Sequence, residues 1–321
     1  MMPFLILCKD SIFLAMALSL NIKDETSQLK AVILGTAKSM GPVPKIEDAY
    51  DPKSIEHIKK GTYPSESDMV EEMEAVSKIL NKYDVQVYRP KVIADCNQIF
   101  TRDIALVIED ILIISNILPH REKEIQAIQH VIDAIHPDKV VRAPSEAIHF
   151  EGGDIIVHDN YIFIGTYKGE DYADCIVART NMKGVKFIKS LFPEKTVKEF
   201  DLQKSMTNPR NNALHLDCCF QPVGKNKAII HKEGFRNESD YEFLINYFGK
   251  NNVFSIDKEE MYMMNSNIFS IAEDVVISEK GFTRLNAWLR SLGITVEEVP
   301  YAEIAKQEGL LRCSTLPLIR S

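Results

Sequence analysis

The alternation of apolar runs and polar turns in this 321-residue chain predicts a repeating series of short strands and helices. Each repeat begins with two apolar runs separated by a short polar turn, which is the pattern of a β-hairpin. A segment with apolar residues at helical spacing follows, and then another short apolar strand. The predicted hairpins are 104–115, 154–165, 213–231 and 267–278.

Helices are predicted after these hairpins at 122–135, 180–191, 239–248 and 281–291, and strands after the helices at 139–142, 196–200, 253–256 and 294–299.

The two ends of the chain supply the parts of a fifth unit. The opening part contains a strand at 30–35, a helix that Ser67 begins and Lys82 ends, and a strand at 85–89, while a last strand is expected near 312–319. The segment between the first strand and this helix, 38–64, is rich in Gly, Pro and Lys and is predicted as a long loop that forms a lid. Five similar units that close on themselves predict one ring-like α/β domain with a pseudo-fivefold axis.

One stretch, 211–222, carries an imidazole and a carboxylate that are two residues apart. If the stretch is a strand, His215 and Asp217 point to the same side, where they can move a proton and hold a cation. The alternative is an exposed polar face of an edge strand.

Polar residues recur at corresponding points, namely the start of the first strand of each unit. They are Phe100-Thr-Arg-Asp103 in the first unit, Phe150-Glu-Gly-Gly-Asp154 in the second, His215 and Asp217 in the third, Asn265 and Asn267 in the fourth, and Cys313 in the closing strand. Equivalent positions of a ring meet at its axis, so we predict a pit lined by Asp103, Glu151, His215, Asp217 and Cys313.

These side chains have complementary chemistry. A cysteine becomes a nucleophile when a nearby cation stabilises its thiolate, and carboxylates would attract and orient a cationic, planar guanidinium. His215 would donate a proton to a departing amine and later take one from water. Gly152 and Gly153 would let the backbone approach the ligand closely. Asp154 has a simpler alternative, which is a hydrogen bond to the turn after the two glycines.

Four motifs, Phe-Thr-Arg-Asp, Glu-Gly-Gly-Asp, His-Leu-Asp and Arg-Cys-Ser, resemble those of the guanidino-modifying superfamily in the same order, over about residues 29–320. This superfamily includes arginine deiminases, dimethylarginine dimethylaminohydrolases and glycine amidinotransferases, and the resemblance implies a five-bladed β/α propeller. It further implies that Cys313 is the nucleophile, His215 the general acid/base and Glu151 the carboxylate that contacts both His215 and the guanidinium.

The remaining roles also follow from the resemblance. Asp103 and Asp217 match the residues that hold the guanidinium nitrogens, and Arg179 and Arg121 match those that bind the α-carboxylate of the substrate. Arg121 has an alternative as a solvated residue at the N-terminus of a helix. The family pattern implies no cofactor and no metal.

The expected function is a thiol-dependent hydrolase acting on the guanidino or ureido group of arginine or an arginine derivative, with citrulline and ammonia or an amine as products in the guanidino case. Three features are similar to those of the hydrolases in the superfamily: Glu151 in its motif, the Arg-Thr-Asn sequence at Arg179, and the length of the chain. The alternatives are an amidinotransferase and a non-enzymatic binding protein of the same fold. The sequence Glu308-Gly-Leu-Leu-Arg departs from the glycine-rich segment usual before the cysteine, which leaves the exact substrate open.

Composition narrows the partners and the compartment. The net charge of −8 argues against nucleic acid or an anionic membrane, so we expect a small guanidino or ureido amino acid as the partner. The sequence leaves open whether the protein forms a homodimer. Six scattered cysteines without a Cys-x-x-Cys spacing favour a reducing, cytoplasmic compartment.

The N-terminus is expected to lie outside the catalytic domain. We place this domain at 29–321 and regard 1–28 as an N-terminal extension that need not belong to the native protein. Lys9 and Asp10 interrupt its apolar residues, so no stretch is long enough to cross a bilayer. We expect translation to begin at Met16, and the alternative is a signal peptide.

Overall fold

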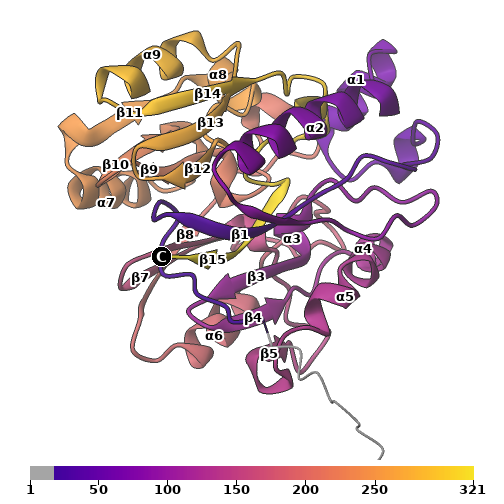
Figure 1. Ribbon diagram of the computed structural model, residues 1–321, viewed down its shortest axis with the longest axis horizontal. Helices are drawn as coiled ribbons and strands as arrows, with labels where there is room; N and C mark the ends of the chain where they lie inside the picture. Colours follow the sequence, from indigo (N-terminus) through magenta and orange to yellow (C-terminus); the bar gives the residue numbers. More distant parts are fainter. Residues whose placement is uncertain (1–17) are drawn as a thin grey trace, which may run out of the picture.

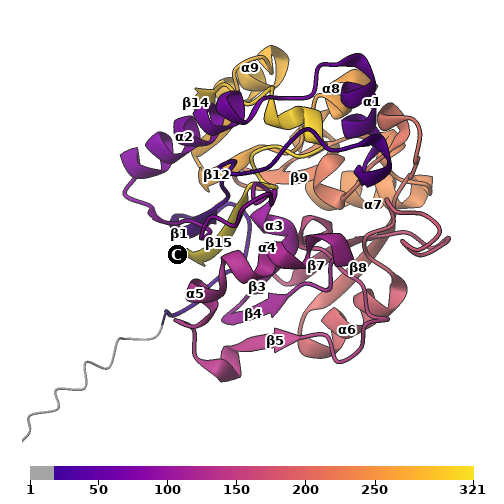
Figure 2. The same ribbon diagram turned by 90° about the vertical axis from the view of Figure 1, so that its right-hand side faces the viewer.

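The computed structural model describes residues 18–321, which form an α/β fold of five three-stranded sheets (Figures 1 and 2). In each sheet, the middle strand pairs antiparallel with one neighbour and parallel with the other. Four of the sheets are continuous in sequence: β3-β4-β5 (Ala105–Ile108, Ile111–Ile114, Val140–Arg142), β6-β7-β8 (Ile155–His158, Tyr161–Thr166, Thr196–Asp201), β9-β10-β11 (Phe220–Val223, Lys227–Ile230, Val253–Ser255) and β12-β13-β14 (Phe269–Ala272, Val275–Glu279, Thr295–Val299).

The fifth sheet joins the two ends of the chain. Its middle strand β1 (Leu29–Leu34) pairs antiparallel with the last strand β15 (Thr315–Arg320) and parallel with β2 (Gln86–Tyr88). In Figure 1 the yellow β15 lies beside the indigo β1. The predicted assembly of a fifth unit from both chain ends is therefore confirmed. This pairing also brings Cys313, two residues before β15, next to segments that follow β1.

The helices connect the strands, and most lie where the apolar spacing predicted them. They are α1 (Pro52–Lys60), α2 (Glu66–Lys82), α3 (Thr101–Ile104), α4 (Glu122–Ala127), α5 (Gln129–Ile132), α6 (Met182–Leu191), α7 (Glu238–Phe248), α8 (Lys258–Tyr262) and α9 (Thr283–Ser291).

Three local predictions about the helices are wrong. The segment 38–64 is not all loop, because it contains α1, whose first turn is capped by the Asp51 side chain. The cap of α2 is Ser65, which accepts a hydrogen bond from the amide of Asp68, and not Ser67. The helix expected at 122–135 is interrupted at Ile128, so it becomes α4 and α5.

The prediction of a strand around His215 and Asp217 is also wrong. Leu216–Cys218 form one turn of 3₁₀ helix, and strand β9 begins only at Phe220. The amide of Leu216 donates to the side chain of Asp154 at 2.9 Å, and the amide of Cys218 donates to the carbonyl of His215. These bonds replace those of a sheet, so the two side chains do not meet by alternation along a strand.

Residues 18–28 pack against the rest of the fold. Leu20 and Ile22 are buried in the same apolar cluster as β1, β3 and β4, and Ile22 forms a bridge with Glu109. The domain boundary at residue 29 stays a prediction, whereas the expected start at Met16 and the alternative signal peptide lie outside the described residues. Within 18–321, no helix combines the length and the apolar character that crossing a membrane requires.

Candidate active site

A cavity of about 430 Å³ opens at the place where the motifs converge. Asp103, His215 and Cys313 line it, as predicted from their positions in the repeats. Glu151 and Asp217 do not line it; they are fully buried directly behind His215 and Cys313. The five residues are therefore brought together, with three at the cavity surface and two in a supporting layer.

Cys313 lies in a turn before β15, and its side chain is 1% exposed. Asn267 holds it from one side: its amide nitrogen is 3.1 Å from Sγ, and its side-chain oxygen accepts the backbone N–H of Cys313 at 3.1 Å. On the other side, Oδ2 of Asp217 lies 3.6 Å from Sγ. Burial raises the pKa of the Cys313 thiol well above its usual range, and the charges of Asp217 and Asp103 raise it further. The thiol of the ligand-free protein is thus protonated at neutral pH.

His215 is 1% exposed and lies between two carboxylates. Its Nε2 is 2.8 Å from Oε2 of Glu151, and its Nδ1 is 3.7 Å from Oδ1 of Asp103. Burial acts to lower the pKa of His215, but Asp103 and the hydrogen bond to Glu151 outweigh it and raise the pKa above the ordinary value. The alternative of an exposed edge-strand face is wrong for both His215 and Asp217.

Two buried arginines complete this charged layer. Arg179 donates to Glu151 at 3.2 Å and to the carbonyl of Tyr50 at 3.0 Å. Arg121 forms a two-pronged pair with Glu124, with both bonds at 2.8 Å, and also donates to Asp103 at 2.9 Å. Arg121 is only 6% exposed, so its alternative as a solvated helix residue is wrong.

These arginines explain the ionisation of Glu151. Burial acts to raise the pKa of Glu151, but the charge of Arg179 and the hydrogen bond with His215 outweigh it and hold the pKa well below the usual range. Glu151 therefore stays a carboxylate and can stabilise an imidazolium at His215.

The Glu-Gly-Gly-Asp motif serves the packing of this layer more than ligand contact. A methyl group on Gly152 would lie 2.1 Å from the carbonyl oxygen of Arg102, and one on Gly153 would lie 2.7 Å from Cγ and Nδ1 of His215. The glycines thus let protein segments approach one another, whereas we had expected an approach to a ligand. Asp154 was expected to bond the turn after the glycines, and instead it accepts from Leu216, beside His215.

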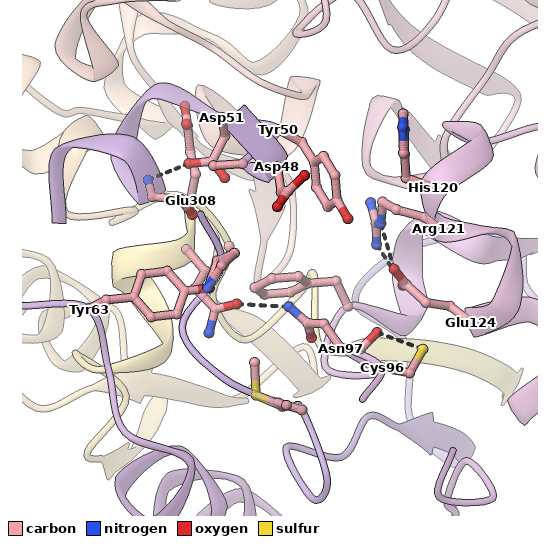
Figure 3. Close-up of a pocket in the computed structure, with 18 of the residues that line it drawn as sticks. Asp48, Tyr50, Asp51, Tyr63, Cys96, Asn97, His120, Arg121, Glu124 and Glu308 are labelled. Carbon is pink, nitrogen blue, oxygen red and sulfur yellow. Dashed lines mark hydrogen bonds and ion pairs between the residues drawn. The ribbon is translucent and has the colours of Figure 1, made fainter. Parts of the chain in front are cut away.

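The outer wall of the cavity comes from the segment between β1 and α2 and from the turn before Cys313 (Figure 3). Asp51 and Tyr63 lie on one side, Arg121 and Glu124 lie on the other, and the ring of Tyr50 extends towards Arg121. Glu308 is buried in this wall, has a positive φ of 57° and accepts a hydrogen bond from Asn212 at 2.7 Å. Burial and the neighbouring Asp51 raise the pKa of Glu308 well above its usual range. Residues 40–44 and 48–51 line the cavity, so this part of the expected lid forms part of its wall, and closure of the segment over the site stays a prediction.

Sequence reasoning missed the ion pairs beneath the cavity. Arg312 is completely buried and donates to Asp217 and to Glu25, each at 2.8 Å. Nothing in the pattern around Glu25 marked it, because its partner is 287 residues away. Asn267 was noticed as the equivalent of the acidic positions, but its contacts with Cys313 depend on the closure of the ring.

Asp103, Glu151 and His215 also have a geometry that a metal ion could use, since their ligand atoms lie within 4.8 Å of one another. The two carboxylates are already paired with cations, Asp103 with Arg121 and Glu151 with Arg179. Oδ1 of Asp103 is buried and accepts no hydrogen bond within the described residues. An acceptor of this kind at a cavity surface suits a ligand that donates N–H bonds.

Comparison with known sequences places the chain among proteins that act on guanidino groups. It is 27% identical to the uncharacterized protein YkgA of Bacillus subtilis over 224 residues, 70% of each chain. It is 25% identical to an arginine deiminase of Oenococcus oeni over 292 residues, which cover 78% of this chain and 67% of that protein.

Solved structures share the fold at lower identity. The N-terminal domain of ArgZ, a cyanobacterial arginine dihydrolase, superposes with a TM-score of 0.73 at 16% identity, covering 91% of this chain and 98% of that one. SxtG, an amidinotransferase from Microseira wollei, gives 0.71 at 18% identity, with 94% and 97% covered. A Pseudomonas aeruginosa dimethylarginine dimethylaminohydrolase in complex with citrulline gives 0.66 at 20% identity, with 91% and 100% covered.

The sequence model of the eukaryotic N,N-dimethylarginine dimethylhydrolases matches residues 48–320, which include every motif described above. The chain therefore belongs to this family, and with it to the guanidino-modifying superfamily.

Proposed function

We propose that this protein is a thiol-dependent hydrolase that acts on the guanidino or ureido group of arginine or an arginine derivative through a covalent intermediate on Cys313. One observation carries the proposal: Cys313 and His215 line one cavity, while Asp217 supports the sulfur and Glu151 supports the imidazole. A binding protein of the same fold would need no nucleophile paired with a proton donor.

The carboxylates select the substrate group. A planar guanidinium would donate to Asp103, whose Oδ1 is unpaired within the described residues, and would approach Asp217 beside the sulfur of Cys313, behind which Asp217 is buried. Arg121 and Arg179 are the proposed holders of the substrate carboxylate, and both now bond to protein acceptors, namely Glu124 and Asp103 for Arg121 and Glu151 and the carbonyl of Tyr50 for Arg179. Binding a carboxylate therefore exchanges or shares existing hydrogen bonds.

The substrate cation starts the reaction. In the ligand-free protein the thiol is protonated, because burial and two carboxylates raise its pKa. A guanidinium beside Sγ offsets the charge of Asp217 and Asp103, so it lowers the pKa of the thiol and promotes the thiolate. For a guanidino substrate, the cation of the substrate itself thus activates the nucleophile.

The steps then balance as follows. The thiolate bonds to the guanidino carbon, and the C–N bond to the leaving nitrogen breaks while protonated His215 gives that nitrogen its proton. Water then attacks the carbon of the S-linked intermediate, and His215 takes its proton. The C–S bond breaks, and for an arginine substrate the products are citrulline, ammonia or an amine, and the thiolate, which takes back from solvent the proton that it lost to solvent when the substrate bound.

We further propose that the five sheets are the blades of a β/α propeller whose pseudo-fivefold axis passes through the cavity. The proposal is supported by the repeated strand plan and by the convergence on one cavity of residues that shortly precede β3, β9 and β15. The catalytic domain would comprise residues 29–321, with residues 18–28 packed against it.

The test is a panel of guanidino and ureido amino acids, including arginine and methylated arginines, incubated with purified protein. A colour assay for ureido groups should detect citrulline, and mass spectrometry of acid-quenched enzyme should find an adduct on Cys313. The Cys313→Ser variant should keep the fold and lose turnover. Product that forms only with an added amine acceptor would establish an amidinotransferase, and activity retained in Cys313→Ser would refute the nucleophile.

The carboxylate contact is tested separately with Arg179→Ala. We expect KM to rise about tenfold or more for arginine and to change little for agmatine, which lacks the carboxylate. An equal rise for both compounds would remove the argument for an amino-acid substrate.

A further inference from the structure

A buried ion network lies directly beneath the proposed nucleophile and begins in the N-terminal segment. Arg312, the residue before Cys313, is 0% exposed, and its partners Asp217 and Glu25 are 0% and 4% exposed. Its NH1 donates to Oδ2 of Asp217 at 2.8 Å. That oxygen is the one that lies 3.6 Å from Sγ of Cys313. Arg312 therefore acts on the carboxylate that is nearest to the sulfur.

Glu25 determines how Arg312 is shared between its two acids. Nε and NH2 of Arg312 both donate to Glu25, at 3.3 and 2.8 Å, so the two-pronged pairing that arginine favours is made with Glu25. Asp217 receives only the one bond from NH1. Its Oδ1 makes only long contacts, 3.8 and 3.9 Å, with the sulfurs of Cys218 and Cys313. Asp217 thus keeps an accepting oxygen on the side of the thiol.

We propose that Glu25 is a positioning residue for the reaction: it holds the guanidinium of Arg312 and so keeps Asp217 turned towards Cys313 and only partly neutralised. The inference rests on the proposed function, because it assumes that Asp217 holds a substrate guanidinium. Glu25 touches neither the cavity nor a reacting atom, so its effect passes through Arg312 and Asp217.

The charges around the thiol fix the sign of the effect. The ionisable groups that face Cys313 or its direct partners are Asp217, Asp103, His215, Arg312, Arg102, Cys218 and Tyr301. When Glu25 loses its charge, no carboxylate at that position offsets the positive charge of Arg312. The guanidinium of Arg312 can then donate further hydrogen bonds to Asp217. Both changes favour the thiolate and weaken the hold of Asp217 on a cation.

The experiment measures alkylation of Cys313 by iodoacetamide as a function of pH in the full-length, ligand-free protein, with the site identified by mass spectrometry. In Glu25→Gln we expect the apparent pKa of the thiol to fall by about one unit, which makes alkylation at neutral pH about tenfold faster. We also expect KM for the guanidino substrate to rise about tenfold, with a smaller change in kcat. A residue that served the fold alone would not make the thiol more acidic.

Asp24→Asn is the matched control, since it removes a carboxylate next to Glu25 whose bonds go to the amides of Thr26 and Ser27 and not to Arg312. Its alkylation profile should equal that of the parent protein. Glu25→Asp keeps the negative charge, so its thiol pKa should equal that of the parent protein. It is the second variant to measure if Glu25→Gln is too unstable.

The two proposals fail in different ways. An unchanged alkylation profile in folded Glu25→Gln, a Glu25→Asp profile that is shifted to lower pH, or an Asp24→Asn profile that is shifted as far as that of Glu25→Gln would overturn the positioning role. A parent protein that turns over no guanidino or ureido compound, while Glu25→Gln still shifts the thiol pKa, would overturn the proposed function and would support the coupling of Glu25 to Cys313.

Discussion

Individual side chains around the cavity are in close contact with their neighbours, so substitutions there should act directly on the geometry of the site. The His215 ring packs against the backbone at Gly153, with Glu151 and Asp103 at its nitrogens. The sequence marked all four residues because each belongs to a motif. It did not reveal which neighbour each glycine faces, since that depends on segments that are 50 or more residues apart.

Gly153→Ala should reduce catalysis without unfolding the protein. The new methyl group would lie 2.7 Å from His215 and 3.0 Å from Oδ1 of Asp103, so the ring must move off the geometry that Glu151 fixes. We expect kcat to fall about a hundredfold, as misplacing a reacting group commonly does. The matched control is Gly169→Ala, whose methyl group would first meet the side chain of Tyr167 in an exposed loop. A Gly153→Ala enzyme with parental kcat would contradict the assigned role of the imidazole.

The titration of His215 should report the charge of Asp103. Because Asp103 helps to raise the pKa of His215, the ring of the parent protein should stay protonated to a pH above the ordinary 6.5. In Asp103→Asn this support is lost while burial continues to lower the pKa, so the midpoint should shift to lower pH. Proton NMR of the ring in ligand-free protein measures it. A midpoint that is equal in both proteins would show that Asp103 does not set the ionisation of His215.

At the scale of elements, the hairpins were predictable because their turns are encoded locally. Glu109, Asp159 and Asn226 have positive φ values of 52–55° and stand between apolar runs. The turn at Leu216–Cys218 was not predictable, because its amides bond within the turn and to Asp154, which is 62 residues away. Helix α1 was missed because its apolar positions are few, and it is fixed by the Asp51 cap and by contacts with the turn before Cys313.

Helix α1 and its cap should influence substrate binding. Asp51 accepts from the amide of Ser54 at 2.7 Å and also lines the cavity. Asp51→Ala removes cap and charge together, with an expected cost of about 1 kcal/mol and faster hydrogen exchange in α1. Asp51→Asn keeps a capping oxygen and removes only the charge.

The pair of variants separates the two roles of Asp51. If the order of α1 governs binding, KM should rise in Asp51→Ala and stay near the parent value in Asp51→Asn. The control Asp257→Ala removes the cap of α8, outside the cavity lining, and should lower stability similarly while leaving KM unchanged. Equal KM values in all four proteins would show that α1 does not contribute to binding.

At the scale of the whole molecule, both chain ends meet at the site. β15 pairs with β1, and Glu25 binds Arg312, so the N-terminal segment and the C-terminal strand hold each other beneath Cys313. The repeating pattern predicted the pairing of β15 with β1, because four units were complete and the strands left over at the two ends formed a fifth. It could not predict the ion pair, because a buried charge is visible in a sequence only through its partner.

The ion pair between Glu25 and Arg312 should make the free energy of unfolding depend on pH. Burial acts to raise the pKa of Glu25, but Arg312 and Arg102 outweigh it and lower the pKa from 4.5 to about 2. A carboxyl with a depressed folded-state pKa contributes stability that is present above pH 4.5 and is lost as the pH falls towards about 2. The shift corresponds to about 3 kcal/mol.

Denaturant unfolding of the parent and Glu25→Gln proteins between pH 7 and pH 2 should give a difference in free energy of unfolding that shrinks by about this amount. A constant offset from the unpaired Arg312 remains, and Asp24→Asn should show no such narrowing. Parallel curves for parent and Glu25→Gln would mean that Glu25 is not ionised against Arg312 in the folded protein.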